Sequence, residues 1–270
     1  GSAKVTEEQM QGIPHHLISV LDPHENFDIV RFKQMADEAI DDICSRGRLP
    51  VMCGGTGFYI QSVIYGIDFT ENESRPDIRA RLQAYADEHG ADALHDLLRE
   101  RDPASAEAIH PHNVRKVIRA LEFWELSGGI AISEHNARER GRQPVFDLAY
   151  FGLYRPRELL YADIDRRVDM MMEQGLLDEV KGLIEAGVPL NGTAMQALGY
   201  KELAEHLGGG CSLEEAVEKI KTGSRHYAKR QLTWLRRERN VIWINMQDFA
   251  SIGEAADLLA RKCTEIFTSA

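Results

Sequence analysis

Basic residues are concentrated towards the C-terminal end of the sequence, on a segment that the sequence predicts to be a long helix. Lys221, Arg225, Lys229 and Arg236 fall within an arc of about 80° when successive residues are placed 100° apart. Such a stripe suits a diphosphate or an RNA backbone, because charge-assisted hydrogen bonds are the strong ones. The alternative is a solvated, salt-bridged helix face, although the stripe lacks interleaved acids at i+4. The pattern favours binding and leaves both interpretations open.

A second candidate is the turn Gly54-Gly55-Thr56-Gly57, which directly follows the short apolar run at residues 49–53. If that run is a buried strand, Thr56 places a hydroxyl at the carboxyl end of a strand, where open α/β sheets bind ligands. The glycines would let the backbone approach a ligand closely. The turn matches neither G-x-G-x-x-G nor G-x-x-x-x-G-K-[ST], so a tight turn without a ligand remains the alternative.

The charge distribution limits the kinds of partner that the protein is expected to bind. The chain of 270 residues has a net charge of −11, which argues against indiscriminate binding of polyanions. Residues 225–239 nevertheless carry six Lys or Arg and one acid, Glu238. A concentrated basic patch on an acidic protein fits a partner that is recognised at one place, such as a phosphate cluster or one RNA stem.

Composition also narrows the class of protein. No apolar run approaches the roughly 18 residues that span a bilayer, so no membrane partner is expected. Cys44, Cys53, Cys211 and Cys263 form no C-x-x-C pair and no metal spacing, which favours free thiols and a cytoplasmic location. His15-His16 has no companion at metal spacing either, so the sequence predicts no metal-ligating residues.

The elements that would position these residues follow the order of an α/β protein. The apolar patterns predict helices at 26–46 and 58–65, a strand at 148–154, helices at 157–186, 194–207 and 213–238, a strand at 241–245 and a helix at 252–267. Residues 76–126 are helical and charge-rich, with breaks at Gly90, Pro103 and Pro111, and residues 127–144 are expected to be a loop. We therefore expect an α/β core at 1–67 and 148–270, interrupted by a helical insertion at 68–147.

Five stretches carry a resemblance to a known family. They are Gly12-Ile13-Pro14-His15-His16-Leu17-Ile18 with Leu21-Asp22-Pro23, Gly54-Gly55-Thr56-Gly57-Phe58-Tyr59, residues 115–122 ending in Arg119-Ala120-Leu121-Glu122, Ala197-Leu198-Gly199-Tyr200-Lys201, and Arg225-His226-Tyr227-Ala228-Lys229-Arg230-Gln231-Leu232-Thr233-Trp234-Leu235-Arg236. Together, and in this order, they resemble the tRNA dimethylallyltransferases. The last stretch is the most specific of the five.

The resemblance implies a P-loop-type α/β fold, a parallel sheet flanked by helices, whose helical insertion grips the anticodon stem-loop of tRNA. In such enzymes an adenine beside the anticodon is flipped into a channel and meets dimethylallyl diphosphate there. Its exocyclic amine attacks the allylic carbon and diphosphate leaves, with Mg²⁺ neutralising charge. Catalysis then requires in-line positioning and stabilisation of a polyanionic leaving group.

Site residues follow from the matched motifs. The resemblance implies a catalytic Thr56 that also lies on the tRNA side, and a diphosphate site at Arg167, helped by Arg225 and Lys229. It implies contacts to tRNA from two further groups of residues. These are Arg79, Arg115, Lys116, Val117, Ile118 and Arg119 in the insertion, and Gln196, Ala197, Leu198, Gly199, Tyr200 and Lys201 in the core.

One departure from the family pattern affects activity. In the family, a phosphate-cradling loop and an Asp-Ser-x-Gln-Val-Tyr segment, whose Asp acts as the general base, precede the stretch matched by Gly12-Ile13-Pro14. Neither segment occurs in these 270 residues. We therefore expect this polypeptide to bind tRNA and to transfer no prenyl group by itself.

Two rival functions remain. An adenylate prenyltransferase would share the fold, but the basic face of the insertion favours tRNA over a free nucleotide. A non-catalytic RNA-binding protein would need no phosphate-cradling loop. No coiled-coil pattern argues for more than a monomer.

Overall fold

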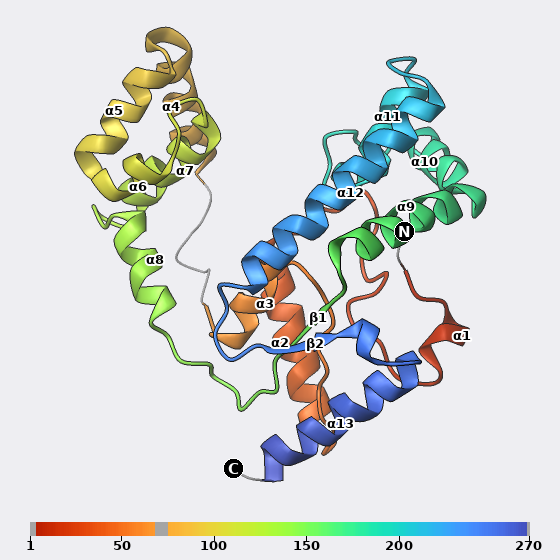
Figure 1. The fold of residues 1–270 in the computed structure, drawn as a ribbon. Coiled ribbons are helices and arrows are strands. Elements are labelled where there is room, and N and C mark those ends of the chain that lie inside the picture. Colours follow the sequence, from red (N-terminus) through yellow and green to blue (C-terminus); the bar gives the residue numbers. More distant parts are fainter. Residues whose placement is uncertain (1–3, 68–74, 269–270) are drawn as a thin grey trace. The chain divides into compact units, whose positions relative to one another are not determined.

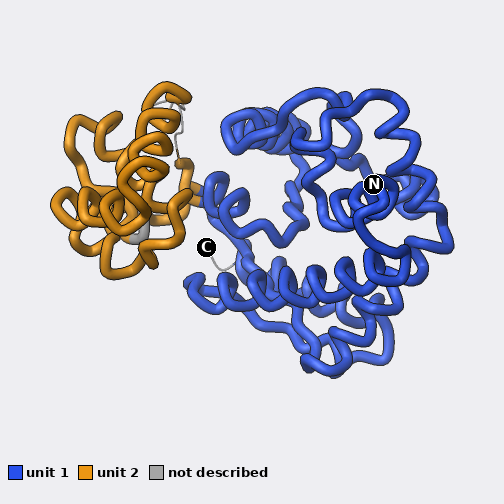
Figure 2. The backbone as a smooth tube through the Cα atoms, turned by 90° about the horizontal axis from the view of Figure 1, so that it is seen from above, with its two compact units in different colours: residues 1–64, 146–270 blue, residues 65–145 orange. Residues whose placement is uncertain are grey.

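The computed structural model of the chain describes residues 4–67 and 75–268. The chain divides into two compact units (Figure 2). Unit 1 consists of Gly1–Ile64 and Phe146–Ala270, and unit 2 consists of Tyr65–Val145. Because unit 1 contains chain on both sides of unit 2, unit 2 is an insertion into unit 1.

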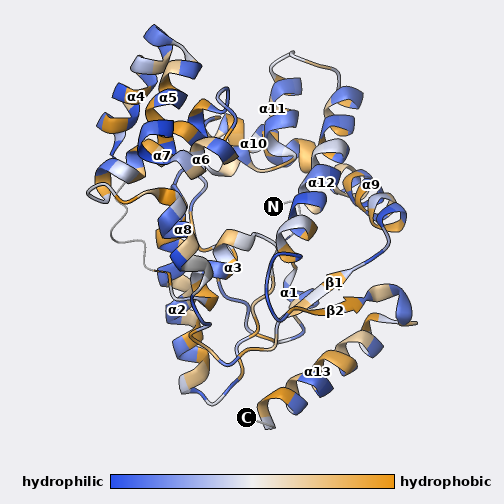
Figure 3. Ribbon diagram, turned by 60° about the vertical axis from the view of Figure 1, so that its left-hand side comes forward, coloured by the Kyte–Doolittle hydropathy of each residue, from blue (hydrophilic) through white to orange (hydrophobic). Residues whose placement is uncertain are grey.

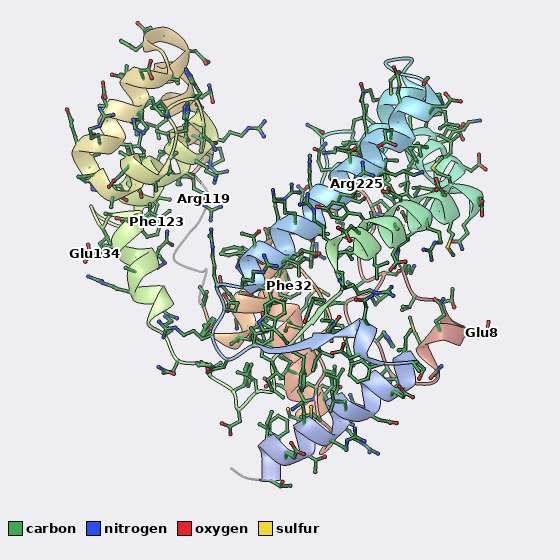
Figure 4. The ribbon with its side chains drawn as sticks, in the orientation of Figure 1. Glu8, Phe32, Arg119, Phe123, Glu134 and Arg225 are labelled. Carbon is green, nitrogen blue, oxygen red and sulfur yellow. The ribbon has the colours of Figure 1, made fainter. Side chains whose placement is uncertain are left out.

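The first helices of unit 1 are α1 (Glu7–Met10), α2 (Ile29–Ser45) and α3 (Gly57–Ile64). Helix α2 begins where the Asp28 side chain accepts a hydrogen bond from the Arg31 N–H at 2.9 Å, a favourable N-cap. The ring of Phe32 on α2 stacks on Tyr59 of α3 with centroids 4.3 Å apart (Phe32 is labelled in Figure 4). This stacking helps to fix α3, whose first turn carries the glycine motif.

The sheet of unit 1 is parallel. Strands β1 (Phe151–Tyr154) and β2 (Ile242–Asn245) pair in register, with Phe151 opposite Ile242. The chain between them runs through several helices, as the connection between parallel strands requires. Strand β2 is apolar (orange in Figure 3), and its Ile244 is buried.

The predicted buried strand at residues 49–53 is wrong. The segment is irregular, and Val51 is 77% exposed and Leu49 57% exposed. A strand depends on backbone hydrogen bonds from a neighbouring strand. Within the described chain β1 and β2 pair only with each other, so residues 49–53 have no strand beside them.

The remaining elements of unit 1 are α9 (Arg157–Glu173), α10 (Leu176–Glu185), η1 (Ala194–Gln196), α11 (Tyr200–Leu207), α12 (Leu213–Leu235), η2 (Met246–Asp248) and α13 (Ile252–Thr268). Helix α12 begins at the capping box of Ser212 and Glu215. The predicted single helix at 157–186 is wrong, because Gly175 at φ +92° separates α9 from α10.

Helices α9 to α12 enclose the larger core of unit 1. Figure 1 shows α9 running beside α12, with α10 and α11 at their far ends. The buried residues of this core are Val168, Leu176, Val180, Val188, Met195, Tyr200, Leu203, Ala216 and Ile220. No helix among the described residues is long and apolar enough to cross a membrane.

Unit 2 is helical, with α4 (Pro76–His89), α5 (Ala91–Arg101), α6 (Pro103–Ala108), α7 (Val114–Leu126) and α8 (Ile132–Arg140). The breaks fall at Gly90, before Pro103 and around Pro111, as the sequence predicts. Its core consists of Leu82, Ala86, Leu94, Leu98, Ala106, Val117, Ile118, Ala120 and Leu121.

Helix α8 lies in the stretch that the sequence predicts to be a loop, so that prediction is wrong. The buried Asp102 accepts hydrogen bonds from the N–H and the hydroxyl of Ser133, at 3.0 and 2.6 Å, and from the Ser105 N–H. Burial alone would raise the pKa of Asp102, but these hydrogen bonds outweigh it and lower that pKa. A carboxylate distant in sequence thus anchors the first turn of α8.

Candidate functional site

Thr56 lies where the glycine turn enters α3. Its carbonyl oxygen accepts the N–H groups of Tyr59 and Ile60 at 3.0 and 3.2 Å, which fixes its backbone to the first turn of the helix. Its side chain is exposed, and its Oγ1 lies 3.2 Å from the phenol oxygen of Tyr227 on α12. The hydroxyl is therefore exposed to solvent and held from two sides.

The glycines beside Thr56 are explained by helix α12. A Cβ on Gly57 would lie 2.1 Å from ring atoms of Trp234, and a Cβ on Gly55 would lie 1.9 Å from Gln231 Nε2. Neither glycine has a positive φ, so close packing and not backbone conformation requires them. A Cβ on Gly54 would meet nothing within 4 Å. Gly55 and Gly57 are thus required by close packing against α12, and the approach of this turn to a ligand stays a prediction.

The residues that contact the glycine turn form one face of α12. Tyr227, Gln231 and Trp234 are four and three residues apart, the spacing of neighbours on a helix surface. At 100° per residue, the middle of this face lies about 150° around α12 from the middle of the cationic stripe. The sequence suggested that Thr56 and the stripe belong to one site, whereas in the structure Lys221 and Arg225 lie on another face of α12 than the residues that contact the turn of Thr56. Lys229, at the edge of the stripe, lines a cavity together with Trp234.

Two cations of the stripe are ion-paired to α9. Lys221 Nζ lies 2.6 Å from Asp169, and one guanidinium nitrogen of Arg225 lies 2.6 and 2.8 Å from the two carboxylate oxygens of Asp165. Hydrogen bonds to Glu218 and then to Asp165 raise the pKa of Arg225. Arg225, labelled in Figure 4, thus braces α12 against α9. The acids absent from α12 at i+4 are supplied largely by another helix.

Arg167 and Lys229, the other two predicted diphosphate ligands, are exposed. Among the described residues neither forms an ion pair with a carboxylate. Lys229 lines an open cavity of about 360 Å³ on α12, together with His226, Arg230, Thr233, Trp234 and Arg237. Because Trp234 lines this cavity and also packs on Gly57, the cavity borders the turn that carries Thr56. It combines cations with an aromatic ring.

The segment predicted to bind tRNA in the core, residues 196–201, is only partly exposed. Gln196, Ala197 and Lys201 are exposed, whereas Gly199 and Tyr200 are buried and Leu198 is half-buried. The Tyr200 hydroxyl donates to Glu179 at 2.6 Å, and burial followed by this carboxylate raises the pKa of Tyr200. Only the exposed members can reach an RNA without rearrangement.

The residues of unit 2 that were predicted to bind tRNA also differ in their exposure to solvent. On α7, Arg115, Lys116 and Arg119 are exposed, and none of them pairs with a carboxylate among the described residues. Val117 and Ile118 lie in the core at 0% and 6% exposure, so they can hold the helix but cannot contact RNA directly.

Arg79 has a structural partner. Its Nε lies 2.8 Å from both oxygens of Glu122, a carboxylate that is 4% exposed. Arg79 neutralises this buried charge and is itself only half-exposed. A contact to RNA would therefore have to be shared with Glu122.

No protein-built metal site is found in the described part of the chain. It contains no group of three or more His, Cys, Asp or Glu side chains that could hold an ion. Mg²⁺ commonly uses one or two protein oxygens and otherwise water and substrate phosphates.

Sequence reasoning missed Tyr227, Gln231 and Trp234 as site residues. All three lie in the most specific of the matched stretches, in which only the cations Arg225 and Lys229 were predicted to bind a ligand. Their spacing of four and three residues was a usable signal of a second face on α12. What the sequence did not show was that this face meets the glycine turn.

Comparisons with known proteins show the family of the chain. Residues 1–238 match the family model described as IPP transferase. A tRNA dimethylallyltransferase of Lachnoclostridium phytofermentans is 47% identical over 265 residues, which covers 98% of this chain and 84% of the relative. A tRNA dimethylallyltransferase of Bacillus licheniformis is 47% identical over 268 residues, covering 99% and 82%.

Solved structures show the same fold. A full-length tRNA isopentenylpyrophosphate transferase from Bacillus halodurans is 40% identical with a TM-score of 0.70, covering 98% of this chain and 82% of that one. A eukaryotic dimethylallyltransferase acting on tRNA is 28% identical with a TM-score of 0.73, covering 94% and 66%. The expected α/β P-loop-type fold with a helical insertion is thereby confirmed. The chain belongs to the IPP transferase family.

Proposed function

We propose that the reaction of this family member is the transfer of a dimethylallyl group from dimethylallyl diphosphate to the exocyclic amine of an adenine adjacent to the anticodon of a tRNA. That these 270 residues by themselves bind tRNA without transferring a prenyl group stays a prediction. Membership of the family and the names of its relatives support the reaction class. The observation that carries the proposal for this chain is the position of Thr56. Its hydroxyl is exposed at the first turn of α3, held by Tyr227, beside a cavity lined by cations.

The chemistry is a substitution at carbon. The amine nitrogen forms a bond to the allylic carbon, the bond from that carbon to the diphosphate oxygen breaks, and diphosphate leaves with the electron pair. The amine then loses a proton to a base. Negative charge develops on the leaving oxygen, and a hydroxyl that donates a hydrogen bond to this oxygen lowers the barrier. Thr56 is our candidate for that donor.

Cations would bind the rest of the diphosphate. Arg167 and Lys229 are exposed and without carboxylate partners in the described chain, so they are the better candidates. Arg225 would first have to release Asp165 and Glu218. We further propose that Mg²⁺ arrives with the diphosphate, bound through phosphate oxygens, where it would neutralise charge.

For tRNA, the proposal uses the exposed members of each predicted group. These are Arg115, Lys116 and Arg119 on α7, and Gln196, Ala197 and Lys201 in unit 1. Binding by the α7 cations would release counterions from the RNA and would therefore weaken with added salt. Action as a monomer in the cytoplasm remains a prediction of the sequence.

Thr56→Ala tests the proposal. Made in the complete natural protein, it should lower kcat by about 100-fold or more, as the loss of one donor to a developing oxyanion does. Affinity for tRNA should change by less than about 2-fold, since one neutral contact contributes little to a large interface. Thr56→Ser is the matched control, because it keeps the hydroxyl and should retain most activity.

Labelled dimethylallyl diphosphate with tRNA as acceptor gives the rate, and a filter-binding assay gives the affinity. Unchanged turnover with weakened tRNA binding would place Thr56 in the RNA interface and not at the reaction. AMP as an alternative acceptor tests the adenylate prenyltransferase, and transfer to AMP in preference to tRNA would replace the proposed substrate.

A further inference from the structure

We propose that Tyr227 is a positioning residue for Thr56, whose phenol donates a hydrogen bond to Thr56 Oγ1 and thereby directs the threonine proton towards the leaving diphosphate. The inference rests on the proposed function of Thr56. Tyr227 would not touch either substrate, and it would act on the reaction only through the threonine hydroxyl.

The argument begins with the hydrogen-bonding capacity of a hydroxyl. Thr56 Oγ1 can accept two hydrogen bonds and donate one. The distance between Thr56 Oγ1 and the Tyr227 phenol oxygen is 3.2 Å. If tyrosine donates, the single proton of Thr56 is left for another acceptor. If threonine donated instead, it would have no proton for a leaving group, so the proposed chemistry requires the first direction.

The position of the phenol is fixed by its neighbours. The Arg230 guanidinium carbon lies 5.7 Å from the centroid of the Tyr227 ring, within range of a cation–π contact. One and two turns further along α12, Gln231 and Trp234 occupy the space that a Cβ on Gly55 or Gly57 would need. The glycine turn and this face of α12 are thus packed together, so the distance between the two hydroxyls is set by the helix and not by a mobile side chain alone.

Two linked hydroxyls can act together. A donor that itself accepts a hydrogen bond is polarised and donates more strongly. The effect matters most when charge develops on the leaving oxygen, so it should appear in turnover more than in substrate binding. This split distinguishes positioning from a simple contribution to binding or to folding.

The experiment is a double-mutant cycle of Tyr227→Phe and Thr56→Ala in the complete natural protein. Tyr227→Phe keeps the ring and its contact with Arg230 and deletes only the hydroxyl. It should lower kcat by about 3- to 10-fold, the effect of one neutral hydrogen bond. The KM values for tRNA and for dimethylallyl diphosphate should change by less than about 2-fold, because ground-state binding is untouched.

The double variant carries the decisive comparison. If Tyr227 acts only through Thr56, the double variant should have the kcat of Thr56→Ala alone, because the second deletion removes nothing more. A fall equal to the product of the two single effects would overturn the inference, since it would mean that tyrosine acts independently of threonine.

Tyr161→Phe is the matched control. Tyr161 also carries a guanidinium over its ring, with Arg157 at 5.1 Å, and its hydroxyl forms no hydrogen bond with the described residues. Tyr161→Phe should leave kcat unchanged. Tyr227→Phe should unfold at the same temperature as the unsubstituted protein. Full kcat for Tyr227→Phe beside an impaired Thr56→Ala overturns the positioning role and leaves the proposed function intact. Full kcat for Thr56→Ala overturns both.

Discussion

Helices α7 and α12 each carry basic residues about one turn apart on one face, yet the two sets differ in exposure and in ion pairing. On α7 of unit 2, Arg115, Lys116 and Arg119 are exposed and pair with no carboxylate among the described residues. On α12 of unit 1, Lys221 and Arg225 are about one-fifth exposed and are bound to carboxylates, chiefly of α9. Figure 4 labels one residue of each set, Arg119 and Arg225.

The difference shows that the sequence pattern of a cationic helix does not reveal whether its charges are available. An exposed cation without a partner can exchange water and counterions for phosphate at little cost. A cation that already neutralises a carboxylate must leave that carboxylate uncompensated before it can bind a ligand. We therefore expect α7 to bind RNA and Arg225 to stabilise the fold.

The largest effect on binding is expected on α7. Replacing both Arg115 and Arg119 by alanine should weaken tRNA binding at low salt by at least about 10-fold, because charge-assisted hydrogen bonds are lost. The slope of log affinity against log salt should fall by about 1.4, or 0.7 for each contact to single-stranded RNA. Electrophoretic or filter-binding titrations at several salt concentrations measure both quantities.

The control for this experiment is Arg138→Ala on α8. It removes an exposed arginine of the same unit that is paired with Glu134, so both the affinity and the salt slope should stay unchanged. If the α7 double variant had the same salt slope as the unsubstituted protein, Arg115 and Arg119 would be solvated surface residues that do not contact RNA. The difference in ion pairing between α7 and α12 would then not predict which cations bind RNA.

Local signals were enough to predict most helices of both units. The apolar period of α2, the capping box of α12 and the breaks at Gly90 and Pro103 act within one or two turns, so a reading of the sequence can find them. The errors came from contacts distant in sequence. Helix α8 depends on Asp102, about thirty residues away, and residues 49–53 form no strand because a strand needs a neighbour.

The candidate site likewise combines features that local sequence signals predicted with contacts that they did not predict. Motif resemblance implied both Thr56 and the cations of α7 as site residues. The pairing of Arg225 with Asp165 and the contact between Thr56 and Tyr227 join residues 60 and 171 positions apart. Neither has a signature in a single sequence, because no local rule relates the faces of two helices that meet only in the fold.

A smaller effect is expected at Arg79, where a predicted RNA contact is also an internal ion pair. Among the described residues, Arg79→Ala leaves the buried Glu122 with only the Arg75 N–H, at 3.3 Å, as a hydrogen-bond donor. This substitution should lower the free energy of unfolding by about 1 kcal/mol. The loss is expected to be this small because Arg79 is half-exposed and solvent screens the ion pair. Chemical denaturation measures this loss. Weaker tRNA binding with undiminished stability would instead place Arg79 with the free cations of α7.

The most direct test of the contrast within α12 compares Lys229→Ala with Arg225→Ala. Lys229 lines the cavity beside Trp234 and has no carboxylate partner among the described residues. Its loss should raise KM for dimethylallyl diphosphate by about 3- to 10-fold, because one solvent-screened charged contact with the substrate is lost. Arg225→Ala should change this KM by less than about 2-fold and should lower the Tm, because Asp165 loses its partner.

Lys221→Ala is the matched control, because Lys221 is also paired with α9, through Asp169. It should behave like Arg225→Ala, with a lower Tm and an unchanged KM in the complete natural protein. If Arg225→Ala raised KM more than Lys229→Ala did while the Tm stayed constant, the ion pair with Asp165 would have to open when substrate binds. Arg225 would then belong to the diphosphate site despite its partner, and pairing in the substrate-free fold would no longer predict which cations bind ligands.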